Sequence, residues 1–188
     1  MLWWIIGGVA IALVVAAVLF IRRRKAAGAL TSIVLMRSGP LHLTEAHVLA
    51  AARRVFKDDA SVASLPLGDT KPPGLLAGFA ILLSGAPVFY VISADRPYGE
   101  AADAENIGDA KVRQVFKSHK AWVSVDVVGG APPAKMRSMV MMSLAVVATG
   151  LMDKETVLLY ATWLGRTAFP SDMKKAGESG NVDAIFTT

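Results

Sequence analysis

The chain has 188 residues, which is enough for one ordinary domain and a short appendage. It carries 20 Lys and Arg against 15 Asp and Glu, but Arg22, Arg23, Arg24 and Lys25 supply four of these positive charges. The remaining 16 basic and 15 acidic side chains nearly cancel, so the chain lacks the broad basic surface that binds a phosphate backbone. The absence of cysteine excludes disulfides, thiolate zinc sites and iron–sulfur clusters. We therefore expect no nucleic-acid partner, no metal and no cofactor.

The N-terminal segment, residues 1–21, contains no charged or polar side chain. A helix of this length spans roughly 30 Å, which is the thickness of the hydrocarbon core of a bilayer. The basic residues 22–25 follow the segment and none precedes it, a pattern typical of an uncleaved anchor rather than of a signal peptide. The positive-inside rule then places the following residues in the cytoplasm. We predict a single-pass transmembrane anchor at 1–21 in the cell membrane, and a basic juxtamembrane linker at 22–31.

The predicted globular domain covers residues 32–172 and begins with a strand over 32–37. Residues 41–57 predict an amphipathic helix, because apolar side chains recur at helical spacing and Thr44 is a suitable N-cap. A short strand is expected over 62–67.

Two stretches without charge, residues 75–94 and 138–152, raise the alternative of a polytopic membrane protein. The first has a Ser-Gly-Ala-Pro turn at its middle, which favours a buried hairpin with strands over 76–83 and 88–93. The second is closed by charges at both ends and spans only roughly 22 Å as a helix. It favours a core helix over 134–151.

The second half of the domain begins with an acidic loop over 95–108. Asp109 then caps a helix with Val112, Val115 and Phe116 on its inner face. Strands are expected over 121–128 and 156–162, separated by the apolar helix at 134–151. Because this helix is apolar on all sides, we expect Met139, Met141 and Met142 to pack in the core. Residues 173–188 predict a polar C-terminal tail.

These elements predict an α+β fold: a two-layer domain with a mixed or antiparallel sheet and helices on one face. In the strand at 121–128, valines alternate with Trp122, Ser124 and Asp126. We expect the valines to face the core and the other three to form an open face that meets water, a partner or a small ligand. Trp122, Ser124 and Asp126, together with His119, are therefore the candidate binding face.

Sequence motifs for catalysis are absent: there is no Gly-rich nucleotide loop, no Gly-x-Ser-x-Gly elbow and no zinc-binding helix. We therefore assign no catalytic residue. The open alternative is a small membrane-bound enzyme in which His119 and a nearby carboxylate, such as Asp126 or one from the acidic loop, act as acid and base. The expected function is that of a non-catalytic cytoplasmic domain, tethered to the membrane, that binds a protein partner or itself.

Residues 32–172 resemble a bacterial domain-of-unknown-function family, number 4261. The resemblance rests on the first strand, the helix at 44–56, the paired strands around the Gly-Ala-Pro turn, the stretch His-Lys-Ala-Trp-Val at 119–123, and the long helix that leads to Val-Leu-Leu-Tyr at 157–160. It implies a compact α+β domain and a bacterial origin, which would make the membrane the cytoplasmic one. The family carries no established activity, so it implies no functional residues.

Overall fold

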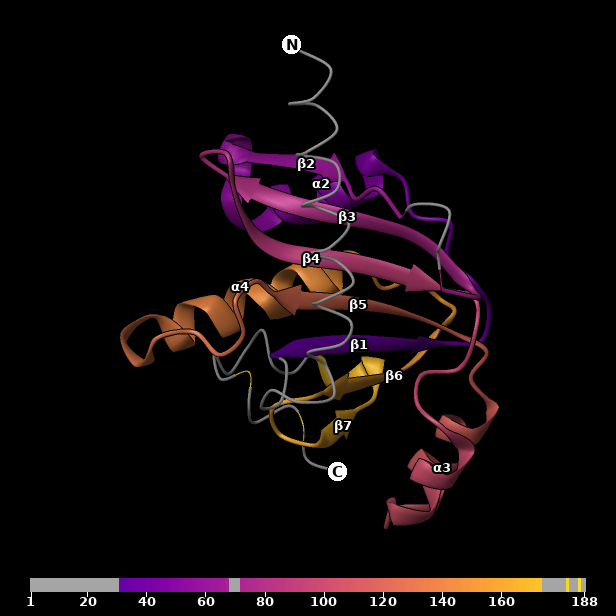
Figure 1. The fold of residues 1–188 in the computed structure, drawn as a ribbon. Helices are drawn as coiled ribbons and strands as arrows, with labels where there is room; N and C mark the ends of the chain where they lie inside the picture. The colour runs from indigo at the N-terminus through magenta and orange to yellow at the C-terminus, as the bar shows by residue number, and fades with distance from the viewer. Residues whose placement is uncertain (1–30, 68–71, 174–181, 183–185, 187–188) are drawn as a thin grey trace.

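The computed structural model describes residues 31–67, 72–173, 182 and 186. Within them, seven strands form one antiparallel sheet in the order β2-β3-β4-β5-β1-β6-β7 (Figure 1). The strands are β1 (Ser32–Arg37), β2 (Ala60–Ser64), β3 (Leu75–Leu83), β4 (Ala86–Ala94), β5 (Ala121–Val127), β6 (Thr156–Ala161) and β7 (Arg166–Ala168). The α-helices are α2 (Glu45–Phe56), α3 (Ala110–Ser118) and α4 (Arg137–Gly150), and the 3-10 helices are η1 (Lys57–Asp59), η2 (Ala101–Asn106) and η3 (Ala134–Met136).

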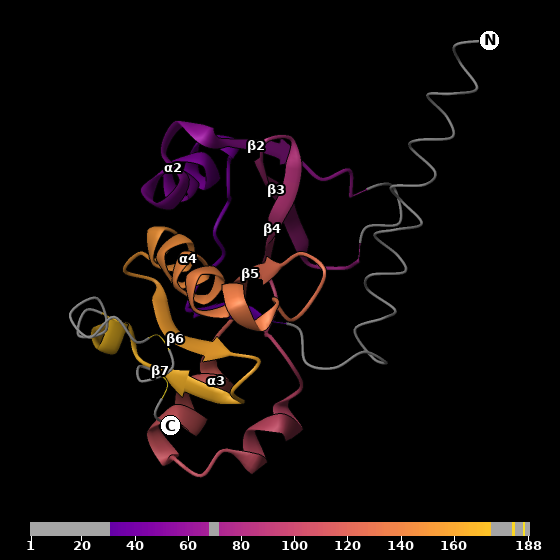
Figure 2. The ribbon, with the colours of Figure 1, turned by 90° about the vertical axis from the view of Figure 1, so that its left-hand side faces the viewer.

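Helices α2 and α4 lie side by side on one face of the sheet (Figure 2). Helix α2 begins at the predicted cap, where the Thr44 hydroxyl accepts a hydrogen bond from the His47 N–H at 3.3 Å. The two helices cover the main core, to which β1 contributes Ile33 and Leu35. The α+β class and the antiparallel sheet are therefore confirmed.

Helix α3 lies on the opposite side of the sheet, which corrects the prediction of helices on one face. Its Val112 is buried in a cluster with Met36 and Leu158. Met36 follows Leu35 in β1, and neighbouring side chains of a strand point to opposite faces. Leu35 faces the core under α2 and α4, so Met36 faces the other side of the sheet, where α3 covers it.

Three local differences separate the structure from the sequence predictions. Strand β2 begins earlier than expected, β7 was not predicted, and the acidic stretch contains η2. This short helix is held by a capping box in which Glu100 and Asp103 exchange side-chain and backbone hydrogen bonds. Its Ala104 is fully buried, so the acidic stretch packs on the domain rather than forming an open loop.

The methionines and the C-terminal tail also depart from expectation. Met141 is buried in the core as predicted, but Met139 is 60% exposed, so its assignment to the core is wrong. Of the predicted polar tail at 173–188, the structure describes three residues, and all three belong to the core under α2 and α4: Met173, Val182 and Phe186.

The predicted anchor at 1–21 and the basic cluster Arg22, Arg23, Arg24 and Lys25 lie outside the described residues. Among the residues that are described, no helix is long and apolar enough to cross a bilayer. The uncharged stretches 75–94 and 138–152 form the β3–β4 hairpin and most of α4.

Candidate functional site

Trp122, Ser124 and Asp126 share one face of β5, opposite the core valines, as their alternation predicts. All three are nevertheless buried, with Asp126 only 1% exposed, which corrects the expectation of an open face. Trp122 is covered by Tyr98, whose ring meets the indole edge-on at a centroid distance of 5.6 Å. The Ser124 hydroxyl donates to the Asp126 Oδ2 at 3.0 Å. The predicted face is therefore buried rather than open to solvent.

His119 ends α3 and is buried, with both of its ring nitrogens bonded to backbone groups. The Tyr98 N–H donates to Nε2 at 2.7 Å, so Nε2 carries a lone pair and the ring proton is on Nδ1. That Nδ1–H donates to the Phe116 carbonyl. Burial lowers the pKa of His119, and the Phe116 carbonyl partly opposes this shift. The neutral imidazole therefore links the end of α3 to the segment that carries Tyr98 through these two hydrogen bonds.

Two neighbouring hollows lie next to His119 and share three wall residues: Tyr98, Gly99 and Phe116. The first, of about 460 Å³, contains the predicted residues His119 and Trp122. The second is of about 560 Å³, and carboxylates contribute to both walls: Glu100 to the first, and Asp103 and Asp109 to the second. The structure thus brings two of the four predicted residues to one hollow, whereas Ser124 and Asp126 line neither.

Two carboxylates in the wall of the second hollow are held by local backbone hydrogen bonds. The Asp103 carboxylate accepts the Glu100 N–H at 2.7 Å, and the Asp109 carboxylate caps α3 through the Val112 N–H at 2.9 Å. Both carboxylates therefore serve as local helix caps. Within the described residues, no three His, Asp or Glu side chains come together as a metal site would require.

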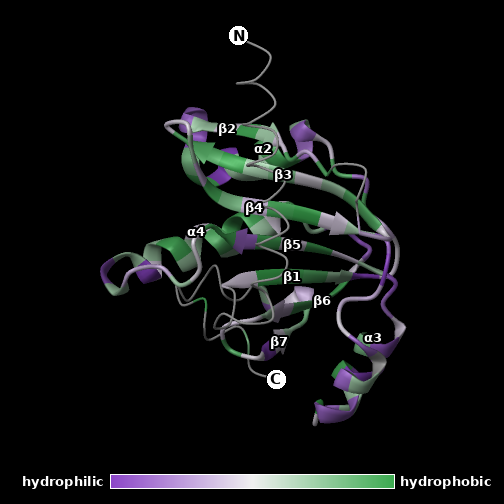
Figure 3. Cartoon of the chain, viewed as in Figure 1, coloured by the Kyte–Doolittle hydropathy of each residue, from purple (hydrophilic) through white to green (hydrophobic). Residues whose placement is uncertain are grey.

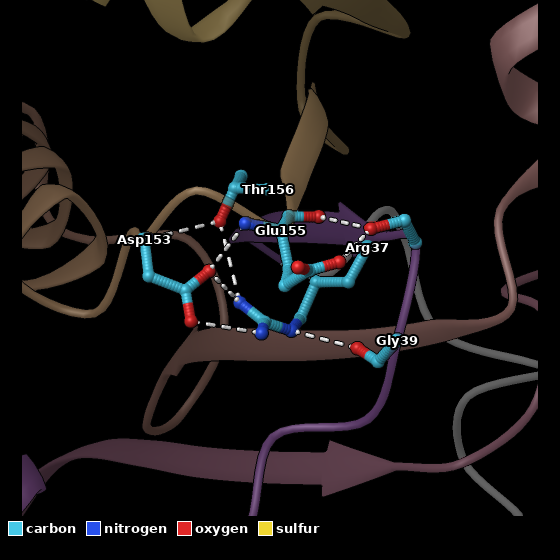
Figure 4. Close-up of polar contacts among 6 residues, drawn as sticks. Arg37, Gly39, Asp153, Glu155 and Thr156 are labelled. Carbon is cyan, nitrogen blue, oxygen red and sulfur yellow. Dashed lines mark hydrogen bonds and ion pairs between the residues drawn. The ribbon is translucent and has the colours of Figure 1, made fainter.

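An ion pair with a buried cation, which sequence reasoning missed, joins the end of β1 to the turn between α4 and β6 (Figure 4). The Arg37 side chain is 1% exposed and donates from Nη1 and Nη2 to the two Asp153 oxygens, at 2.6 and 2.9 Å. Its Nε donates to the Gly39 carbonyl at 3.1 Å. The hydrogen bond from Arg37 holds the pKa of Asp153 below its usual range, although burial acts in the opposite direction. A basic residue at the end of an otherwise apolar strand was the only signal in the sequence.

The two edges of the sheet differ in how well they are protected. Strand β7 has three residues and carries the exposed Arg166. Strand β2 has five residues, Ala-Ser-Val-Ala-Ser, without a charge or a proline. Ser61, Ala63 and Ser64 are exposed, and among the described strands β2 pairs only with β3. Short strands, charges and prolines protect natural edge strands from pairing with other chains. Strand β2 is fairly short, but it has neither a charge nor a proline.

The fold and these features define a class of protein: an α+β domain built on one antiparallel sheet, with aromatic hollows and an edge strand, β2, that pairs on one side only within the described part of the chain. No protein-family profile matches the chain, and neither a curated protein nor a solved structure matches it.

Proposed function

We propose that this protein is a single-pass, membrane-tethered module of the cytoplasmic side that associates with a second copy of itself through the free edge of β2. The observation that carries the proposal is the uncharged, exposed edge of β2. An edge strand directs unpaired N–H and C=O groups outward, and a second strand can satisfy them.

The pairing that we propose is antiparallel and centred on Val62. Val62 is half-buried and packs toward the core, so the neighbouring Ser61 and Ala63 lie on the other face of the strand. In a two-fold antiparallel pair, Ser61 of one copy lies opposite Ala63 of the other. Small neutral side chains at both positions allow close approach without charge repulsion.

Membrane tethering would favour this association. An anchor at 1–21 confines the domain to the bilayer surface, where the effective concentration of a second copy is raised and a modest edge contact suffices. The basic cluster at 22–25 fixes the cytoplasmic orientation by the positive-inside rule. A place in the bacterial family numbered 4261 is compatible with this reading and is part of the same proposal.

The enzyme alternative lacks support from the described site. A general base needs a lone pair within reach of the substrate proton. The lone pair of His119 is used by Tyr98, and its proton is used by Phe116. We therefore propose no catalytic role for His119.

The association is tested with the full chain in detergent micelles, by analytical ultracentrifugation with the detergent contribution subtracted. The variant Ser61→Lys with Ala63→Lys places like charges opposite each other across the pair and should yield monomers. Ser61→Lys with Ala63→Glu places opposite charges there and should restore the dimer. Ala110→Lys with Gln114→Lys adds the same charge to the exposed face of α3 as a matched control. A wild-type chain that is monomeric at all concentrations, or dimers unaffected by the Lys pair, would refute the proposal.

The tether has its own test. Protease added to intact cells should leave the domain uncut, and alkaline carbonate should not release the chain from membranes. Cleavage from outside, or a mature chain lacking residues 1–21, contradicts the anchor and its orientation.

A further inference from the structure

The N-terminal end of α4 carries the two large hydrophobic side chains that are exposed among the described residues. We call residues 134–139, which comprise η3 and the first turn of α4, the α4 tip. Its Met136 is 48% exposed and Met139 is 60% exposed, and no other large hydrophobic side chain that the structure describes is exposed. Figure 1 shows why: the C-terminal part of α4 packs on the sheet, whereas its N-terminal part extends beyond it. Two exposed apolar side chains three residues apart on one segment are candidates for an interaction surface, unlike single scattered ones.

The charge of the α4 tip has one sign. Lys135 and Arg137 flank Met136, and both are exposed. No Asp or Glu occurs between Asp126 and Asp153, so no acidic residue on this segment offsets the two cations. Polar and apolar residues alternate at the end of the helix in Figure 3. Segments that lie in the interface of an anionic bilayer combine basic side chains with apolar ones, and the α4 tip has both.

The α4 tip also lies at the end of the sheet where the linker from the predicted anchor enters. The Val127 N–H at the end of β5 donates to the Thr31 carbonyl just before β1, at 2.9 Å. Residues 128–133 lead from this point directly to the tip. In Figure 1, α4 extends past the sheet on the side where β5 ends and β1 begins. Nine residues separate Ile21 from Thr31, and even fully extended they reach only about 30 Å.

We propose that the α4 tip docks on the anionic lipid surface of the membrane that holds the anchor, with Met136 and Met139 in the interface and Lys135 and Arg137 at lipid phosphates and carboxylates. The proposal rests on the tether proposed above and adds a defined orientation of the domain. A second copy is the weaker occupant, because two α4 tips would bring four cations together.

The test uses the full chain in lipid nanodiscs, and the absence of cysteine allows clean single-site labelling. Ser138→Cys, within the α4 tip, carries a nitroxide, and Ser118→Cys at the exposed end of α3 is the control. In discs that contain phosphatidylserine, the label at 138 should collide more with oxygen and several-fold less with a water-soluble nickel chelate than in phosphatidylcholine discs. The label at 118 should be equally accessible in both.

Two further variants separate the contributions. Lys135→Gln with Arg137→Gln should weaken docking on phosphatidylserine by up to about 30-fold, since each cation near the surface contributes about 1 kcal/mol. Met136→Ser with Met139→Ser should remove the oxygen signal. Equal nickel accessibility at 138 in the two kinds of disc overturns the proposal, and so does protection that rises with protein concentration in detergent. Retention of the chain in the discs is measured on the same samples: a retained chain with an exposed label refutes the docking alone, whereas a chain that is not retained refutes the tether with it.

Discussion

Arg37 and Asp153 form a two-pronged ion pair in which the cation is buried and the anion is half open to water. The Arg37 side chain is 1% exposed and that of Asp153 is 41% exposed. The guanidinium also donates to the Thr156 hydroxyl at 3.4 Å, on the strand that follows the turn. The pair therefore fastens the turn between α4 and β6 to the end of β1. Its two members should respond differently to substitution, because only one of them depends on the other for solvation.

Replacing Asp153 with Ala should lower the free energy of unfolding by about 1–3 kcal/mol, since it leaves a buried cation unpaired. The loss should stay below the roughly 3–5 kcal/mol of a fully buried pair, because water reaches one side of the carboxylate. Combining it with Arg37→Met removes the orphaned charge, so the double variant should be no less stable than Asp153→Ala alone. Urea unfolding followed by tryptophan fluorescence measures this, and Lys154→Ala on the same exposed turn is the control. A strictly additive loss in the double variant would show that the two side chains do not act as a pair.

The same pair predicts a dependence of stability on pH. The hydrogen bond from Arg37 lowers the pKa of Asp153 in the folded chain, so the unfolded chain binds a proton first as the pH falls. The ion pair therefore contributes fully to the free energy of unfolding above the pKa of Asp153 in the unfolded chain, about 3.9. This contribution is lost as the pH falls through the lower pKa of the folded chain. Wild type should therefore lose more stability than Asp153→Asn when the pH is lowered below 4, in urea titrations at several pH values. Parallel curves for the two proteins would contradict this assignment.

A tight contact between α2 and α4 gives an independent prediction. A Cβ added at Gly150 would lie 2.9 Å from the Cβ of Ala51 and 3.0 Å from its Cα. Gly150→Ala gains about 1 kcal/mol of helix propensity but overpacks this contact, which typically costs about 1–3 kcal/mol. We expect a net loss of stability in thermal unfolding, and partial recovery when Ala51→Gly is added. Gly108→Ala, where no atom lies within 4 Å of the new Cβ, is the matched control.

The parts of this fold that the sequence predicts are those set by neighbours along the chain. The two faces of β5, the cap at Thr44 and the turn at Gly85 each depend on a few adjacent residues, and the structure confirms all three. Strand β7 and η2 escape prediction because a three-residue strand and a short polar helix have no clear periodicity.

Features that depend on the extent of the sheet were not predictable in the same way. The pattern of α4 indicates an apolar helix but not where its supporting strands end, so Met139 was expected in the core although it lies beyond them. Likewise, alternation divides β5 into two faces without showing that Tyr98 would cover Trp122. Arg37 and Asp153 are separated by 116 residues, and no local pattern connects them.

The hydrogen bonds of the buried His119 predict both how stability changes with pH and which ring nitrogen carries the proton. Burial lowers the pKa of His119 in the folded chain, whereas in the unfolded chain it keeps the ordinary pKa of about 6.5. The unfolded chain therefore takes up the proton first as the pH falls below about 6.5. Stability should therefore rise with pH up to about 6.5 and gain nothing more from this group above it. This window lies above that of Asp153, so the two effects are separable in one series of urea titrations. His119→Gln can supply a donor for Phe116 and an acceptor for Tyr98 without titrating, so it should flatten the rise that the wild type shows below about pH 6.5. His42→Gln, at an exposed position, should leave the rise unchanged. Nitrogen NMR of the full chain in micelles should show the proton on Nδ1 at neutral pH, and a proton on Nε2 would contradict the bond from Tyr98 on which the structural role depends.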